Sequence, residues 1–452
     1  MHKKLSLKDY IYLASMLFGM FFGAGNLIFP VYMGQLAGSN VWPATIGFLI
    51  TGVGLPLLGI VAMGISHSNG LNDMGNRVHP IYSIFLTCAL YLTIGPFFAI
   101  PRTATVSFEV GLAPLLPDNQ VKLSLAIFSL LFFIAVLWFS IRPSKILTWI
   151  GKIINPIFLI SLSILIIAAM INPMASIAEV PVAESYQSNS FFKGFLEGYN
   201  TMDALAALAF GIVVITVIRN LEVNEPNTIA ADTIKSGFFS TLLMALIYIF
   251  LTMIGAQSRG VYAVSANGGE ALSIISKHYL GSIGSFILAI TMIFACLKTA
   301  IGLITSCSET FVALFPKTLG YKAYAILFCV VSFAIANVGL ANIISFSIPV
   351  LMMLYPLAIT LILLSLFHPI FGGARLIYRS VTLFTFFAAI FDFIKALPDG
   401  IKDAGNLHAA VTFASKYLPF YDLGLGWIVP AILGFIIGIV LYLAPITKRA
   451  EE

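Results

Sequence analysis

Charged residues are scarce in this chain. Asp, Glu, Lys and Arg make up 10% of its 452 residues, whereas 60% are hydrophobic and the mean hydropathy is +1.00. Because about a quarter of the residues of a typical soluble domain are charged, this composition excludes an ordinary soluble protein. Apolar stretches of roughly 20 residues, long enough to span a bilayer as a helix, recur almost end to end. They leave no room for a large soluble domain.

Sequence signatures of pumps and enzymes are missing as well. No G-x-x-x-x-G-K-[ST] loop is present, so a nucleotide-driven pump is excluded. The histidines and cysteines show no ligand spacing, and we expect no enzyme activity, no cofactor and no certain metal site. The net charge of +5 comes from scattered basic residues without a continuous stripe, which argues against nucleic-acid binding.

The apolar stretches instead predict about 12 transmembrane helices, and therefore an all-α polytopic membrane protein with a single transmembrane domain over residues 1–452. We place the spans at residues 10–35, 41–66, 81–112, 121–141, 146–171, 191–218, 229–257, 280–314, 321–340, 343–367, 376–397 and 425–443. Lysine and arginine favour the N-terminal side of the membrane by about two to one, so both termini are predicted to face the cytoplasm. The longest loops follow spans five, seven and eleven on the outer side, where we expect caps or partial lids.

The first span is interrupted near its middle. Between Phe18 and Pro30 it holds Gly19, Gly23 and Gly25 together with Asn26. Glycine and proline make a continuous helix costly, and unpaired backbone groups at membrane depth are tolerated only in a protein interior or beside a wet cavity. A helix broken around a ligand is therefore predicted. The alternative is that Gly19 and Gly23 form a packing face of small residues, although Asn26 would still need polar partners.

The sixth span is interrupted in a similar way by the run from Gly198 to Ala207, which contains Thr201, Met202 and Asp203. A carboxylate inside a span marks a candidate functional site. Alternatively, Asp203 lies nearer an interface or caps the second half-helix. Two broken helices present free N–H groups and free carbonyls, which suit the carboxylate and ammonium of a zwitterion. An apolar wall, or else plain core, is predicted from Phe22, Met202, Leu205, Ala206 and Phe210.

Span three carries two charged residues, Arg102 and Glu109. They are seven residues apart, so they share a helix face but do not touch. We expect each to pair with another span, either as a structural ion pair or in gating.

Several of these stretches resemble the bacterial branched-chain amino acid:cation symporter family, the BrnQ-type carriers. They are the run from Phe21 to Pro30, the run from Gly95 to Glu109, Thr201-Met202-Asp203, and the run from Ala295 to Glu309. The resemblance covers essentially the whole chain. It implies a LeuT-like fold with two inverted five-helix repeats, at about 10–171 and 191–367, followed by two extra helices within about 376–443. It also implies a multi-pass protein of a bacterial-type inner cell membrane.

The resemblance implies a set of site residues too. The substrate would be held by Phe22, Gly23, Ala24, Gly25, Asn26, Thr201, Met202 and Asp203. Asn26 and Thr201 would hold one coupling cation, and Gly19, Phe22, Lys298 and Thr299 would lie at a second cation position. Lys298 departs from the small or hydroxyl residue expected there, which leaves the coupling ion open between H+ and Na+.

Lys298 lies deep within its predicted span, where a lysine cannot easily reach either interface and needs a partner or must lose its proton. Its ammonium would stand in for a sodium ion, or it is a structural lysine that pairs with Glu309 or faces a watery vestibule. The resemblance implies a secondary symporter that imports leucine, isoleucine and valine with a cation. A channel with the same broken helices is the alternative.

Overall fold

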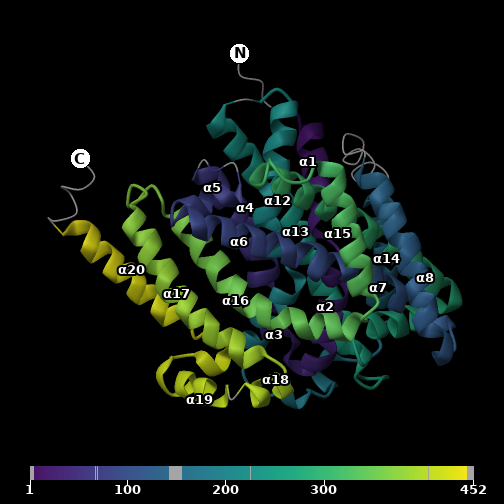
Figure 1. Ribbon diagram of the computed structural model, residues 1–452. Coiled ribbons are helices and arrows are strands. Elements are labelled where there is room, and N and C mark those ends of the chain that lie inside the picture. The colour runs from purple at the N-terminus through teal and green to yellow at the C-terminus, as the bar shows by residue number, and fades with distance from the viewer. Residues whose placement is uncertain are drawn as a thin grey trace.

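The computed structural model describes residues 5–66, 68, 70–141, 155–223, 225–405 and 407–444. Within these ranges the regular elements are all helices, many of them long and packed side by side (Figure 1). The beginning of α1 (Leu7–Phe21) and the end of α20 (Ile428–Leu443) lie on the same side of the bundle in this view. The predicted start of span five, residues 146–154, lies outside the described residues.

The first five predicted spans correspond to eight numbered helices, because three of the spans are divided, and the short helix α5 lies in the connection between spans two and three. Serine and proline begin two of these helices: Ser6 and Asp9 cap α1 reciprocally, and Pro80 occupies the first position of α6, where its missing N–H costs nothing. The helices are α1, α2 (Ala24–Ala37), α3 (Val41–Leu49), α4 (Leu55–Ile65), α5 (Leu71–Asn76), α6 (Pro80–Leu92), α7 (Ala99–Gly111), α8 (Asp118–Ser140) and α10 (Asn155–Ile171).

Spans two and three contain π-helical turns that the sequence analysis did not predict. They cover Ile50–Gly54 between α3 and α4, and Thr93–Phe97 between α6 and α7. In the second turn Gly95 has non-helical dihedral angles and Pro96 follows it, so the helix is bent beside the first break of the chain.

The remaining spans agree with the predicted ones to within a few residues at most ends. One exception is α14, which begins at Gly268, 12 residues before the predicted start at 280, and is kinked at Gly281, where φ is +59°. The helices are α11 (Ser190–Glu197), α12 (Asp203–Asn220), α13 (Pro226–Ser258), α14 (Gly268–Leu314), α15 (Tyr321–Ala336), α16 (Leu340–Leu366), α17 (Arg375–Ala396), α18 (Asp399–Ala404), α19 (His408–Tyr417) and α20.

Two long connections, between α10 and α11 and between α17 and α20, contain short helical elements on the side of the bundle opposite the start of α1 (Figure 1). The segment between α10 and α11 docks on the end of α2, where the Ala183 N–H donates to the Leu36 carbonyl at 2.9 Å. The connection between α17 and α20 folds into α18 and α19, which lie across the lower end of the bundle in Figure 1. Both segments cover helix ends, as expected for caps.

The centre of the bundle depends on the close approach of α2 and α13. A Cβ on Gly34 of α2 would lie 2.2 Å from the Thr252 carbonyl oxygen, and one on Gly255 of α13 would lie 2.1 Å from the Val31 carbonyl oxygen. Small residues allow membrane helices to meet backbone to backbone, since the bilayer itself provides no hydrophobic force between them. This contact brings the side chains of α13 up to the broken first span.

Candidate functional site

The predicted break in the first span is present at Phe22 and Gly23. Helix α1 ends at Phe21, Phe22 is extended with φ −76° and ψ 97°, and α2 starts at Ala24. Asn26 accepts a hydrogen bond from the Gly23 N–H at 2.8 Å, so its side chain caps the new helix. A Cβ on Gly23 would lie 2.9 Å from Thr299 Oγ1 of α14, which explains why glycine occupies the break.

The predicted break in the sixth span is present as well. Helix α11 ends at Glu197, a 3-10 turn covers Gly198–Thr201, and α12 starts at Asp203. Met202 joins them in the left-handed region, with φ 62° and ψ 13°. Left-handed backbone is uncommon for a residue with a side chain, and it interrupts the helix here. Asp203 is therefore buried within the span as the first residue of α12, whereas the N-cap is Met202 without a side-chain cap bond, so the alternative in which Asp203 caps the half-helix is not what the structure shows.

A buried hydrogen-bonded network joins the two breaks. Asn26 Nδ2 donates to Asp203 Oδ2 at 2.6 Å and also bonds the Tyr248 hydroxyl, which in turn donates to Asp203 Oδ2 at 2.7 Å. All three side chains are at most 2% exposed. Tyr248 comes from α13, and its role was missed in the sequence analysis because a tyrosine in an apolar span gives no signal until its neighbours are known.

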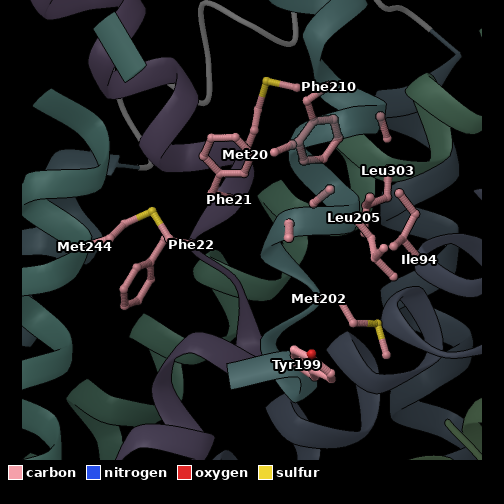
Figure 2. Close-up of a cluster of buried hydrophobic side chains, with 14 of the residues drawn as sticks. Met20, Phe21, Phe22, Ile94, Tyr199, Met202, Leu205, Phe210, Met244 and Leu303 are labelled. Carbon is pink, nitrogen blue, oxygen red and sulfur yellow. The ribbon is translucent and has the colours of Figure 1, made fainter. Parts of the chain in front are cut away.

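A cavity lies between the two breaks. The volume within it that water-sized molecules can reach is about 30 Å³. Polar atoms of one wall come from Asn26, Thr201 and Asp203, and an apolar wall comes from Met20, Phe21, Ile94, Ala206, Phe210 and Leu303. Figure 2 shows Phe21 and Phe210 near each other beside Met20, with Ile94, Leu205 and Leu303 grouped below Phe210 at the right of the view. Such a narrow, mixed cavity admits a larger ligand only if its walls move apart.

Most of the predicted substrate residues meet at this cavity. Gly23, Ala24, Gly25, Asn26, Thr201, Met202 and Asp203 line it, as does Thr299. Phe22 does not, because its ring stacks on Phe18 at 4.9 Å between centroids and lies beside Met244 (Figure 2). Leu205, predicted for the apolar wall, is also outside the lining. Phe22 still reaches the site through its backbone, since its carbonyl lies 3.5 Å from Thr299 Oγ1.

Lys298 lies behind Phe22 rather than in the cavity. Its side chain is fully buried, and the Nζ atom is 4.4 Å from the centre of the Phe158 ring and 5.3 Å from that of Phe18. Aromatic faces attract an ammonium group, so this pair of rings stabilises a charge there. Glu309 is exposed and 11 residues further along the continuous part of α14, about 16 Å along the axis, too far to pair with Lys298.

The two charged residues of span three have different surroundings. Glu109 accepts a hydrogen bond from Asn267 at 3.1 Å, near the start of α14. Arg102 lines the cavity, is 3% exposed and lies with its guanidinium 5.0 Å from the centre of the Phe29 ring of α2. The expected ion pairs with another span are not among the contacts of the described residues, because Glu109 bonds an amide and Arg102 packs on an aromatic ring, and only Arg102 lies at the candidate site.

Comparison with known proteins identifies the family of this chain. Residues 6–444 match the sequence profile described as branched-chain amino acid transport protein. The chain belongs to this family. It is 51% identical over 438 residues to the branched-chain amino acid permease BrnQ of Lactobacillus delbrueckii subsp. lactis, with 97% of each chain covered. It is 43% identical to BrnQ of Bacillus subtilis, covering 98% of each, and 36% identical to BrnQ of Escherichia coli, covering 97% of each.

A solved structure supports the fold. The chain superposes on Mhp1, a nucleobase-cation-symport-1 family transporter in a closed conformation with bromovinylhydantoin bound, with a TM-score of 0.62 and 14% identity. The alignment covers 95% of this chain and 91% of that one. The expected family and the all-α polytopic transporter fold are therefore confirmed, and the family is not one of enzymes. The limits of the two repeats stay a prediction.

Proposed function

We propose that the protein is a secondary symporter that imports branched-chain amino acids, coupling their entry to a gradient of protons or sodium ions. The observation that carries the proposal is the meeting of two helix breaks on one cavity, joined by the buried network of Asn26, Asp203 and Tyr248. The relatives named branched-chain amino acid permeases support the substrate class.

The cavity suits such a substrate chemically. The first turns of α2 and α12 border the cavity, where the positive end of a helix dipole favours a carboxylate, and Asp203 supplies a negative charge for an ammonium group. The apolar wall of Phe21, Ile94 and Phe210 would receive an aliphatic side chain. Charged side chains would be rejected there, because a buried apolar wall leaves their charge without partners.

The coupling ion is proposed from Lys298 and its surroundings. In the bundle its ammonium lies beside the last turn of α1, close to the break whose carbonyls would otherwise hold a metal cation. Release and binding of a proton by Lys298 would then replace release and binding of sodium. Both termini are proposed to face the cytoplasm, which places the segments around α18 and α19 outside.

The test is uptake of radiolabelled leucine into proteoliposomes with sodium and proton gradients imposed separately. A symporter accumulates leucine against its gradient, saturably, when one of the two gradients points inward. Isoleucine and valine should compete strongly and lysine and glutamate weakly, and because a pocket separates single methylenes by only about 1–3 kcal/mol, the three branched substrates should overlap. Linear, non-saturable flux that follows only the leucine gradient would identify a channel, and equal competition by charged amino acids would contradict the substrate class.

A further inference from the structure

Arg102 has no assigned role in the transport cycle proposed above, yet it is the one basic residue among those that line the described cavity. Its side chain is 3% exposed, and its Nη1 atom is fully enclosed without a hydrogen-bond partner in the described part of the chain. An enclosed guanidinium N–H without a partner is costly, because five donors in a fixed fork require acceptors. Such a group calls for an acceptor that arrives with a ligand.

The position of the guanidinium indicates which ligand atoms it would meet. A Cβ on Gly25 would lie 3.3 Å from Arg102 Nη2, so the guanidinium reaches the first turn of α2. Helix α2 has 14 residues, and the first N–H groups of a helix lack acceptors within it. Arg102 and this helix end therefore form one cluster of donors with positive potential, and a carboxylate is the group that such a cluster binds best.

The opposite charge lies on the facing part of the same cavity. Asp203 is within electrostatic range of Arg102, but no direct ion pair joins Arg102 to a residue in the described ranges. Asp203 is instead held by Asn26 and Tyr248. The two charges are thus kept apart by other contacts, which leaves each available to one end of a zwitterion.

We propose that Arg102, together with the N-terminus of α2, binds the α-carboxylate of the substrate and makes the transporter selective for free carboxylates. The inference rests on the proposed function and adds the residue that recognises the carboxylate. Arg102 is a direct substrate ligand in this arrangement, and Phe29 positions its guanidinium by lying 5.0 Å beneath it.

The experiment compares leucine with leucinamide, which keeps the ammonium and side chain but lacks the carboxylate. In the wild-type protein leucinamide should inhibit leucine counterflow on the order of 100-fold more weakly than unlabelled leucine does, as expected for loss of a charge-assisted contact. In Arg102→Gln the half-saturating leucine concentration should rise on the order of 100-fold, while the leucinamide inhibition constant stays within about 3-fold of its wild-type value. The preference for leucine over leucinamide should therefore be lost. Arg102→Lys should fall between them, because a point charge replaces the planar fork.

A matched control is Arg379→Gln, which removes an equal charge from α17, where Arg379 donates to the Val78 carbonyl at 3.0 Å far from the cavity. The Arg379→Gln variant should keep the wild-type preference for leucine over leucinamide. Equal inhibition of the wild-type protein by leucine and leucinamide overturns the inference even if the Arg102 variants fail to fold. A parallel loss of both ligands in Arg102→Gln also overturns it, since a structural role alone would act on both. Absence of leucine transport by the wild-type protein would instead refute the proposed function.

Discussion

Two buried carboxylates on spanning helices, Asp203 and Asp392, have opposite surroundings. Asp203 of α12 is 1% exposed, and its Oδ2 atom accepts hydrogen bonds from Asn26 and Tyr248. Asp392 of α17 is 2% exposed, but neither of its oxygens has a hydrogen-bond partner in the described part of the chain. Burial alone therefore does not distinguish the two residues. Their partners do.

The difference shows how a functional site is held in a membrane protein. Two other spans, α2 and α13, contribute one polar side chain each to Asp203 of α12, so its geometry is fixed before a ligand arrives. The Asp392 side chain of α17 lies near Gly426 in the segment before α20, and Lys395 is in electrostatic range. We therefore expect transport to depend strongly on the network around Asp203 and weakly on Asp392.

The largest effect is expected at the network itself. Asp203→Ala and Asn26→Ala should each lower leucine uptake by roughly 100-fold or more, because each removes bonds to a charged group that contribute about 1.5–3 kcal/mol apiece. Membrane insertion should be unchanged, since span hydrophobicity does not fall. Asp392→Asn is the matched comparison and should keep uptake within about 3-fold with equal or higher thermal stability, because it removes a poorly satisfied charge. Normal transport by Asp203→Ala and Asn26→Ala would refute their placement in the site.

The next largest effect is expected at Lys298, a buried lysine beside the first break. Lys298→Ala should lose leucine accumulation driven by an inward proton gradient, by about 10-fold, while gradient-free counterflow persists, because the coupling group is gone and the cavity remains. Lys416→Ala, which removes a lysine lying 5.3 Å from the Tyr417 ring on the exposed α19, serves as control and should behave like wild type. Sodium-driven uptake together with a full pH response in Lys298→Ala would show that the lysine is structural.

A smaller effect should come from the helix contact that carries Tyr248 to Asp203. Gly34→Ala would force α2 and α13 apart, since its Cβ would lie 2.2 Å from the Thr252 carbonyl oxygen, and we expect a loss of about 1–3 kcal/mol of stability. Gly302→Ala in α14, where nothing lies within 4 Å of the added Cβ, should be neutral or slightly stabilising. Thermal unfolding in detergent, followed by the loss of monodisperse protein on heating, measures both. Equal unfolding temperatures for the two variants would contradict the close contact.

The smallest effect is expected for Tyr248→Phe. It removes one bond to the charged Asp203 but leaves Asn26 bonded to Asp203 at 2.6 Å, so the loss should lie at the lower end for such a bond, about 1.5 kcal/mol, and the half-saturating leucine concentration should rise by about 10-fold at most. Tyr355→Phe is a suitable comparison, because the Tyr355 hydroxyl is buried without a hydrogen-bond partner in the described ranges, and its removal should change uptake less. A larger loss of leucine uptake in Tyr355→Phe than in Tyr248→Phe would contradict the expectation that the hydrogen-bonded hydroxyl contributes more to transport.

The architecture could be predicted from the sequence because a bilayer imposes strict demands on each segment. Apolar length predicted the spans, and glycine, proline and a polar residue within one span predicted the breaks near Gly23 and Asp203. The π-helical turn at Thr93–Phe97 was missed, since a single glycine and proline in an apolar run do not reveal how the helix accommodates them. The early start of α14 was missed because residues 268–279 are too polar to resemble a span.

The amino-acid sequence by itself determined the membrane class, the approximate spans, the two interruptions and the family resemblance, because these depend on residue types near one another in the chain. Tertiary structure alone decided which side chains meet. Tyr248 joins Asn26 and Asp203, Arg102 lies beside the first turn of α2, and Lys298 lies against Phe158. Within the network of Asn26, Asp203 and Tyr248, bonded residues lie between 45 and 222 positions apart in the sequence. Such distances are set by helix packing, and the local sequence contains no record of them.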